Sequence, residues 1–231
     1  MKRHACAIGA CYELASTRVQ PEFKVSDDPA GVAAELLATT TGHLCITGGS
    51  TPRAAYERIA ELRAEGVWFT DERCVPPDHE HSNFRMANEA LLGRAGIPVH
   101  RMKGELGPVE GAADYEREYE LAGEPVFDLI LLGLGPDAHT CSLFPGDEAL
   151  GERERPVVGV ETPGMAPLVS RITLTLPVVN GSRHIVFLVT GEDKSEAVAR
   201  AFAGAPDPSA PASLVDGEVT VLLDEAAARR L

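Results

Sequence analysis

The sequence predicts an α/β sandwich built around a mainly parallel sheet. Short apolar runs alternate along the chain with segments of helical apolar spacing. One run, VFDLILLGLG at 126–135, is apolar almost throughout, as in parallel strands that are buried on both faces. The connections are short, so the strands are expected to be joined by right-handed crossovers.

The individual elements follow from the same pattern and from local start and stop signals. Asp27 is expected to cap the first helix, with Pro29 just inside it. Ser50 or Thr51 is expected to cap the second helix, and Gly66 to end it. The expected strands are 43–47, 67–70, 126–135, 171–176, 184–190 and 219–224; the expected helices are 30–38, 53–66, 83–96, 109–123 and 192–204, with a loop at 71–83.

Composition limits the classes of partner. The chain carries 21 Lys and Arg against 35 Asp and Glu, a net charge of -14 that repels polyanions at long range. Nucleic acid and anionic membrane surfaces are therefore not expected as partners. An anionic ligand would have to be captured locally.

Cysteine usage and the N-terminus indicate the compartment and the domain organisation. Five cysteines, an odd number without a CxxC pair, argue against a disulfide framework and a structural metal. No signal peptide is recognisable, and no run approaches the about 20 apolar residues of a spanning helix. We expect a soluble, cytoplasmic protein with a poorly ordered extension at 1–21 and a single domain at 22–231.

Four polar clusters follow expected strands directly. They are GGST after 43–47, DER after 67–70, DAHT after 126–135 and GEDK after 184–190. Ligands of open α/β sheets bind beyond the carboxyl ends of the strands. The clusters are therefore expected to meet at one edge of the sheet and to form a site there.

The first cluster, GGSTP, has the composition of an anion-binding turn. Gly48, Gly49 and Ser50 lie between a strand and a helix start, where backbone N–H groups and the helix dipole favour a phosphate. A tight turn with a helix cap is the alternative for this stretch. The GxGxxG order and the Walker lysine are both absent, so a dinucleotide or P-loop site is not predicted.

The second and fourth clusters supply positive charge. Arg73 could form two parallel hydrogen bonds to a phosphate or carboxylate, although a surface ion pair is the alternative. Lys194 is expected in the first turn of a helix, which disfavours a cation unless an anion is bound there. His79 and His81 lack a third ligand at a recognisable spacing, so no metal site is predicted.

The third cluster supplies a candidate base. His139 follows the glycines of GLGPDAHT, and imidazole changes charge near neutral pH, as proton abstraction requires. Asp137 or another carboxylate could orient the ring. Ser142 is not in a GxSxG elbow, so a serine hydrolase is disfavoured, and a Cys141–His139 pair is disfavoured because neighbouring side chains usually point apart.

Together these motifs closely resemble the 6-phosphogluconolactonase family, soluble enzymes of the oxidative pentose phosphate pathway. The resemblance runs from about residue 23 to the C-terminus. It rests on GGSTP, DERCVPPDHEHSNFRMANEALL, FDLILLGLGPDAHTCSLFPG, RITLTLPVVNGSRHIVFLVTGEDK and PASLV. It implies a Rossmann-like three-layer α/β/α sandwich similar to sugar-phosphate isomerases.

The resemblance also implies a reaction, the hydrolysis of 6-phospho-D-glucono-1,5-lactone without cofactor, metal or covalent enzyme intermediate. His139 would be the general base and Asp71 would orient the site. Gly48, Gly49, Ser50, Arg73 and Lys194 would hold the phosphate, with Arg171 as a further anion contact and Asn83 holding the loop or the ligand. The only implied partner is the lactone, and the protein is expected to be a monomer or small homo-oligomer.

Two alternatives and two departures accompany this resemblance. Glucosamine-6-phosphate isomerases (deaminases) share a GSTP loop, but DER and SLFPG favour the lactonase over their DEY and FNEPG-like patterns. A non-catalytic sugar-phosphate sensor would need a helix-turn-helix, for which residues 1–21 give no pattern. Ala138 and Cys141 stand where the lactonase pattern has glycine and alanine, and Ala138 could constrain a turn.

Overall fold

The computed structural model describes residues 20–231; of the predicted N-terminal extension at 1–21, residues 1–19 lie outside the described part. A six-stranded parallel sheet forms the centre, in the order β1-β9-β8-β5-β2-β3. The mainly parallel α/β sandwich predicted from the sequence is confirmed. Its strands are β1 (Glu22–Val25), β2 (His43–Ile46), β3 (Gly66–Phe69), β5 (Leu129–Leu132), β8 (Ile185–Val189) and β9 (Val219–Leu223).

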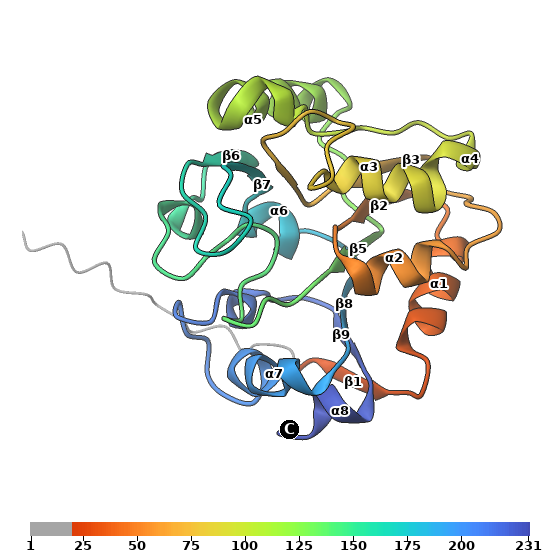
Figure 1. The fold of residues 1–231 in the computed structure, drawn as a ribbon, viewed down its shortest axis with the longest axis vertical. Coiled ribbons are helices and arrows are strands. Elements are labelled where there is room, and N and C mark those ends of the chain that lie inside the picture. Colours follow the sequence, from red (N-terminus) through yellow and green to blue (C-terminus); the bar gives the residue numbers. More distant parts are fainter. Residues whose placement is uncertain (1–19) are drawn as a thin grey trace, which may run out of the picture.

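Helices cover the sheet and pack at its ends (Figure 1). Helices α1 and α2 lie side by side and contact β8, while α7 packs against α8. The helices are α1 (Pro29–Thr39), α2 (Ser50–Tyr56), α3 (Asn83–Ala87), α4 (Gly93–Ala95), α5 (Gly107–Leu121), α6 (Leu176–Asn180), α7 (Ser195–Phe202) and α8 (Glu225–Ala228). No helix within residues 20–231 combines the length and apolar character needed to cross a bilayer.

A second, antiparallel sheet was not predicted. It has the order β4-β7-β6, formed by Asp71–Arg73, Arg171–Leu174 and Val157–Val160, and α5 packs against β6 and β7. The sequence prediction made 71–83 a loop, which is wrong for Asp71–Arg73; the strand predicted at 171–176 is present as Arg171–Leu174, but it pairs in the antiparallel sheet. The physical reason is long-range pairing, since β4 becomes a strand only through its hydrogen bonds to β7.

The second predicted helix is much shorter than expected. Helix α2 ends at Tyr56, and Gly66 is the first residue of β3 rather than a helix stop. The Arg94 guanidinium donates to the carbonyl oxygens of Tyr56 and Ile59, which satisfies backbone groups released at this end of the helix. The chain then follows an irregular path that still buries Ile59 in the core.

Three further helix details differ from the prediction. Asp28, not Asp27, caps α1, and its carboxylate accepts from the Gly31 N–H at 3.1 Å. Gly49 is the N-cap of α2, without a side-chain cap. Lys194 lies in a 3-10 turn just before α7 rather than inside the helix. The segment 83–96 is helical as predicted, with a π-helical turn between α3 and α4.

The four predicted clusters do meet at one edge. β8, β5, β2 and β3 are neighbours in that order, and all their pairings are parallel. Their carboxyl ends therefore point the same way, and the residues that follow each strand emerge together. The antiparallel sheet lies beside this edge, because β4 begins only one residue after β3 ends.

Candidate functional site

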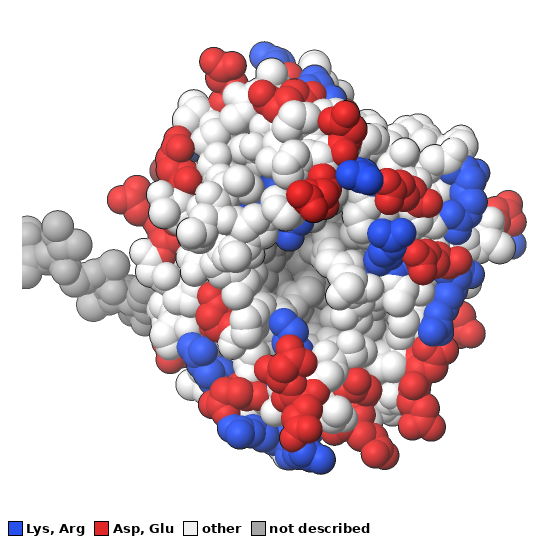
Figure 2. Space-filling view, viewed as in Figure 1, with Lys and Arg blue, Asp and Glu red and all other residues white. Residues whose placement is uncertain are grey.

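A pocket of about 240 Å³ opens at this edge of the parallel sheet. Figure 2 shows the hollow near the middle of one face, with Lys and Arg atoms beside it and acidic side chains spread over the surrounding surface. Eight of the nine predicted site residues line the pocket: Gly48, Gly49, Asp71, Arg73, Asn83, His139, Arg171 and Lys194. The remaining one, Ser50, lines a smaller adjoining cavity of about 160 Å³.

His139 is held by its neighbour Asp137. The Nδ1 atom of His139 lies 2.5 Å from Asp137 Oδ1, and the backbone N–H of His139 donates to the same oxygen at 3.2 Å. Burial raises the pKa of Asp137, but the hydrogen bonds and charge of His139 outweigh it and bring the pKa below its usual value. An ionised Asp137 accepts a hydrogen bond from the N–H of His139 Nδ1, and in that tautomer Nε2 carries the lone pair that can take a proton from a bound molecule.

The backbone around His139 forms a compact turn. Gly135 N–H donates to the His139 carbonyl at 2.8 Å, and Ala138 N–H donates to the Gly135 carbonyl at 2.9 Å. Ala138 has φ of 65°, in the left-handed region, and its side chain is fully buried. Alanine therefore adopts the conformation for which glycine is the usual residue.

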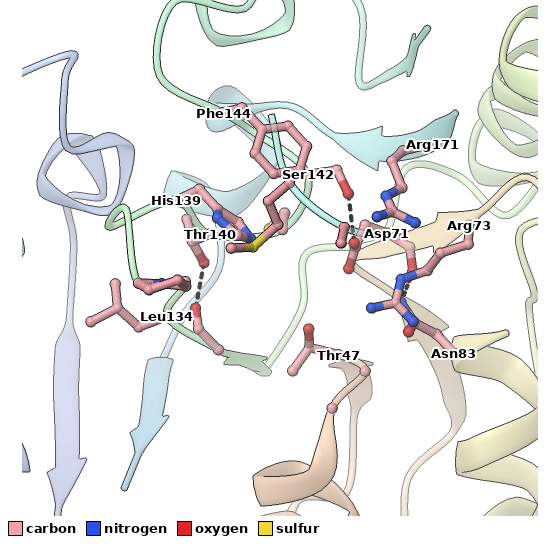
Figure 3. A pocket seen from close by; sticks show the side chains of 18 of the residues that line it. Thr47, Asp71, Arg73, Asn83, Leu134, His139, Thr140, Ser142, Phe144 and Arg171 are labelled. Carbon is pink, nitrogen blue, oxygen red and sulfur yellow. Dashed lines mark hydrogen bonds between the residues drawn. The ribbon is translucent and has the colours of Figure 1, made fainter. Parts of the chain in front are cut away.

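Gly135 is required by the position of the imidazole. A Cβ atom at this residue would lie 2.1 Å from His139 Nδ1 and 2.8 Å from Asp137 Oδ1. The Phe144 ring lies 4.6 Å from the His139 ring, centroid to centroid. Figure 3 shows His139, Thr140 and Phe144 gathered on one side of the pocket. The contact between Phe144 and His139 was not predicted, because no local sequence pattern indicates that two rings pack together.

Asp71 links the histidine loop to the antiparallel sheet. Its Oδ2 accepts from the Ser142 hydroxyl at 2.7 Å and its Oδ1 from the Thr70 hydroxyl at 2.9 Å. Ser142 N–H in turn donates to the Thr173 hydroxyl at 3.1 Å. Both oxygens of this buried carboxylate are engaged, and Ser142 belongs to the same hydrogen-bond network (Figure 3).

Arg73 and Arg171 face each other across the antiparallel sheet. They are directly paired residues of β4 and β7. Arg73 Nη1 donates to the His81 carbonyl at 2.7 Å and Arg171 Nη2 to the Pro167 carbonyl at 2.7 Å. Like charges directly opposite in a sheet are destabilising. This pairing is therefore typical of a site that receives an anion.

The environment of Arg171 supports the same interpretation. The residue is only 3 % exposed, and its Nη1 atom has no hydrogen-bond partner within residues 20–231. Burial, followed by the charge of Arg73, lowers the pKa of Arg171. A buried donor without a partner is costly unless a ligand satisfies it. Figure 3 shows both guanidinium groups on the side of the pocket opposite His139.

Asn83 lines the pocket, and its side-chain amide lies against Gly48 of the glycine turn. Its Nδ2 donates to the Asp71 carbonyl at 2.9 Å, while its buried Oδ1 has no partner in the described part of the chain. A Cβ atom at Gly48 would lie 1.9 Å from this Oδ1. Glycine at 48 is therefore needed for the close approach of the turn to Asn83.

Lys194 lies where the pocket joins the smaller cavity, and lines both. Its Nζ donates to the Leu134 carbonyl at 2.9 Å, so the ammonium also anchors the chain after β5. Gly49 has φ of 120°, which places Ser50 at the first position of α2. The pocket thus contains a second basic region, formed by Lys194 beside the 48–50 turn.

His79 and His81 lie close together, with ring centroids 5.1 Å apart. Across residues 20–231, no group of three or more His, Cys, Asp or Glu side chains is arranged to hold a metal ion. The charged and titratable groups that line the pocket include the His139 imidazole, which Asp137 holds from outside, the Asp71 carboxylate, two guanidinium groups and an ammonium. Chemically, this set can move a proton and bind an anion.

A family model described as glucosamine-6-phosphate isomerases/6-phosphogluconolactonase matches residues 25–223. The chain belongs to this family. Within it, the chain is similar to the 6-phosphogluconolactonases: it is 42% identical to that of Homo sapiens over 183 residues, covering 74% of this chain and 70% of the relative. It is 38% identical to that of Nostoc sp. over 205 residues, covering 81% and 84%. The resemblance inferred from the motifs is confirmed.

Solved structures of the family share the fold. The 6-phosphogluconolactonase from Trypanosoma cruzi superposes with a TM-score of 0.79 at 30% identity, covering 94% of this chain and 99% of that one. A monomeric glucosamine-6-phosphate deaminase superposes with a TM-score of 0.75 at 19% identity, covering 92% and 100%. At that identity the second likeness concerns the fold alone.

Proposed function

We propose that this family member hydrolyses 6-phospho-D-glucono-1,5-lactone to 6-phospho-D-gluconate. Its similarity to proteins named 6-phosphogluconolactonase supports the reaction class. The single structural observation that carries the mechanism is the pocket in which the His139–Asp137 pair faces two arginines. The first supports proton transfer, and the second supports binding of a phosphorylated substrate.

In this mechanism His139 is the general base. Asp137 keeps the Nδ1 proton in place, so Nε2 takes a proton from water as the water oxygen attacks the lactone carbonyl carbon. The tetrahedral intermediate collapses when the bond between that carbon and the ring oxygen breaks. The imidazolium returns its proton to the departing ring oxygen, and the new carboxylic acid loses a proton to solvent. No covalent enzyme intermediate or metal is required.

The phosphate and the sugar hydroxyls are held by the remaining groups. Arg73 and Lys194 supply charge, and Gly48, Gly49 and Ser50 supply N–H groups at the start of α2. Arg171 adds its free Nη1, and Asn83 adds an unpartnered acceptor, in the part of the chain that the structure describes. This local basic cradle would overcome the repulsion expected from the net charge of -14.

The test is the substitution His139→Ala. Turnover of the lactone should fall by about 10²- to 10⁴-fold with the fold retained, because the general base is lost. Phosphogluconate formation is measured, and the enzyme-free hydrolysis rate is subtracted. His184→Ala is the matched control, since His184 bonds Thr220 and does not line the pocket. Wild-type turnover in the His139 variant would rule out the base assignment.

The same assay separates the two alternative functions. A sugar-phosphate isomerase or deaminase would convert glucosamine 6-phosphate and leave the lactone at its uncatalysed rate. A sensor would bind sugar phosphates without turning over either compound. Either result in the wild-type protein would replace the lactonase proposal.

A further inference from the structure

We propose that Glu72 is a positioning residue that holds Arg73 and Asn83 in the arrangement in which they contact the substrate. The inference rests on the proposed function insofar as Arg73 and Asn83 contact the substrate. Glu72 does not line the pocket, so it would act only through its neighbours. Its side chain has no part in the proton transfers described above.

The contacts of Glu72 are unusually complete for a carboxylate that is only 3 % exposed. Oε1 accepts from the backbone N–H groups of Arg73 and Asn83, both at 2.7 Å. Oε2 accepts from the Phe84 N–H at 2.8 Å and from the Ser82 hydroxyl at 3.0 Å. Residues 83 and 84 begin α3, so Glu72 fastens the start of that helix to strand β4.

The hydrogen bonds of Glu72 fix the positions of Arg73 and Asn83. Arg73 follows Glu72 in β4, and its guanidinium is held by the carbonyl of His81, next to the pinned residue Ser82. Asn83 is pinned through its own N–H, and its side chain bonds the Asp71 carbonyl. If the 82–84 segment moves away from β4, the acceptor for Arg73 and the Oδ1 of Asn83 move with it.

The chemistry of the contacts requires an ionised carboxylate. Three of the four partners are backbone N–H groups, which can only donate a hydrogen bond. If an amide NH₂ or a carboxylic O–H replaced either oxygen, its hydrogen would point at one of these N–H hydrogens and the hydrogen bond would be lost. Burial raises the pKa of Glu72 above its usual value, and the hydrogen bonds from Phe84, Asn83, Arg73 and Ser82, which favour the ionised form, offset part of that rise. The negative charge of Glu72 also acts on nearby titratable groups: it acts to raise the pKa of the Arg101 and Arg171 guanidinium groups and of the Cys74 thiol, against or alongside the other causes.

The test compares Glu72→Gln and Glu72→Asp with the wild-type protein. Binding of inorganic phosphate and of 6-phospho-D-gluconate is measured by calorimetry, and kcat and KM for the phosphorylated lactone by the coupled assay. Glu72→Gln should weaken 6-phosphogluconate binding and raise KM by about tenfold, equivalent to about 1.4 kcal/mol, with kcat within about threefold. Glu72→Asp, which retains the charge, should recover part of the affinity. Glu89→Gln, an exposed position in the following π-helical turn, is the control and should behave as wild type.

Each outcome decides the question. Wild-type affinity for both anions in a folded Glu72→Gln protein would overturn the inference, as would a fall in kcat without a change in KM. If Glu72→Gln does not fold, Ser82→Ala removes only the hydroxyl donor and should weaken 6-phosphogluconate binding by about threefold; unchanged binding there would also overturn it. A wild-type protein that binds 6-phosphogluconate but leaves the lactone intact would refute the proposed function. The positioning role of Glu72 would then be judged by the binding measurements on its variants alone.

Discussion

At the scale of single residues, the turn that presents His139 depends on a strained alanine. Ala138 has φ of 65° and is fully buried, and its carbonyl accepts from the Ala212 N–H at 2.9 Å. The left-handed region costs a non-glycine residue about 1–2 kcal/mol. The surrounding hydrogen bonds therefore hold Ala138 in a conformation that alanine alone would not favour.

We predict that Ala138→Gly changes stability by less than about 1 kcal/mol. Relief of the left-handed conformation offsets the lost methyl burial, about 0.8 kcal/mol, and the greater freedom of glycine in the unfolded chain. Ala33→Gly, at an equally buried position in α1, lacks this relief and should cost about 1–2 kcal/mol. Urea unfolding of both variants measures the difference. Equal losses would show that Ala138 is not strained.

The candidate catalytic and binding residues could be identified from the sequence, but the contacts that they make in the folded protein could not. His139 and Arg73 were recognisable because they follow apolar strands directly, and the structure brings both to one pocket. The bond from Ser142 to Asp71 joins residues 71 positions apart, and neither residue type nor local spacing signals it. Contacts of this kind are set by tertiary packing, so they could not be read from the chain.

At the scale of elements, the loop after β5 sets the position of the base. We predict that Gly135→Ala lowers lactone turnover by at least about tenfold, since its Cβ would lie 2.1 Å from His139 Nδ1 and displace the ring. Gly204→Ala is the control, because a Cβ there meets no atom within 4 Å in the described structure. Both variants are assayed alongside their thermal midpoints. Full turnover in a folded Gly135→Ala protein would contradict the tight packing.

Helices and strands were predicted well where the apolar pattern of the sequence is strong. They were predicted poorly where hydrogen bonds to a distant segment determine the structure. The strands β2, β3, β8 and β9 lie within a residue or so of their predicted bounds, because each is a compact apolar run. Strand β4 consists of three polar residues, and only its partner β7, about 100 residues later in the chain, makes it a strand. The end of α2 was misplaced for a similar reason, since a distant arginine satisfies its carbonyls.

At the scale of the whole molecule, the described residues share one hydrophobic core. Buried side chains from the parallel sheet, the antiparallel sheet and the helices form a continuous cluster. Trp68 lies in β3, fully buried and stacked on His100 with ring centroids 3.9 Å apart. Both sheets should therefore lose their structure together.

We predict a single cooperative unfolding transition, which also tests the expectation of one domain at 22–231. Far-ultraviolet circular dichroism follows all the secondary structure, and fluorescence follows Trp68, the one tryptophan of the sequence. The two urea curves should coincide, because a two-state domain gives the same transition by every probe. Separate midpoints would indicate that the two sheets unfold independently.

The pairing of Arg73 with Arg171 has a consequence for how the pocket can change. The parallel sheet presents the base and the glycine turns, whereas both guanidinium groups belong to β4 and β7 of the other sheet. Substitutions at Arg73 and Arg171 should change the anion contacts of this strand pair, whereas Asp71 and Thr173 of the same strands bond Ser142 in the histidine loop and have to be kept. Two of the proposed anion contacts thus belong to one sheet and the proposed base follows a strand of the other, so the two arginines can be substituted while β5 and the loop that carries His139 keep their sequence.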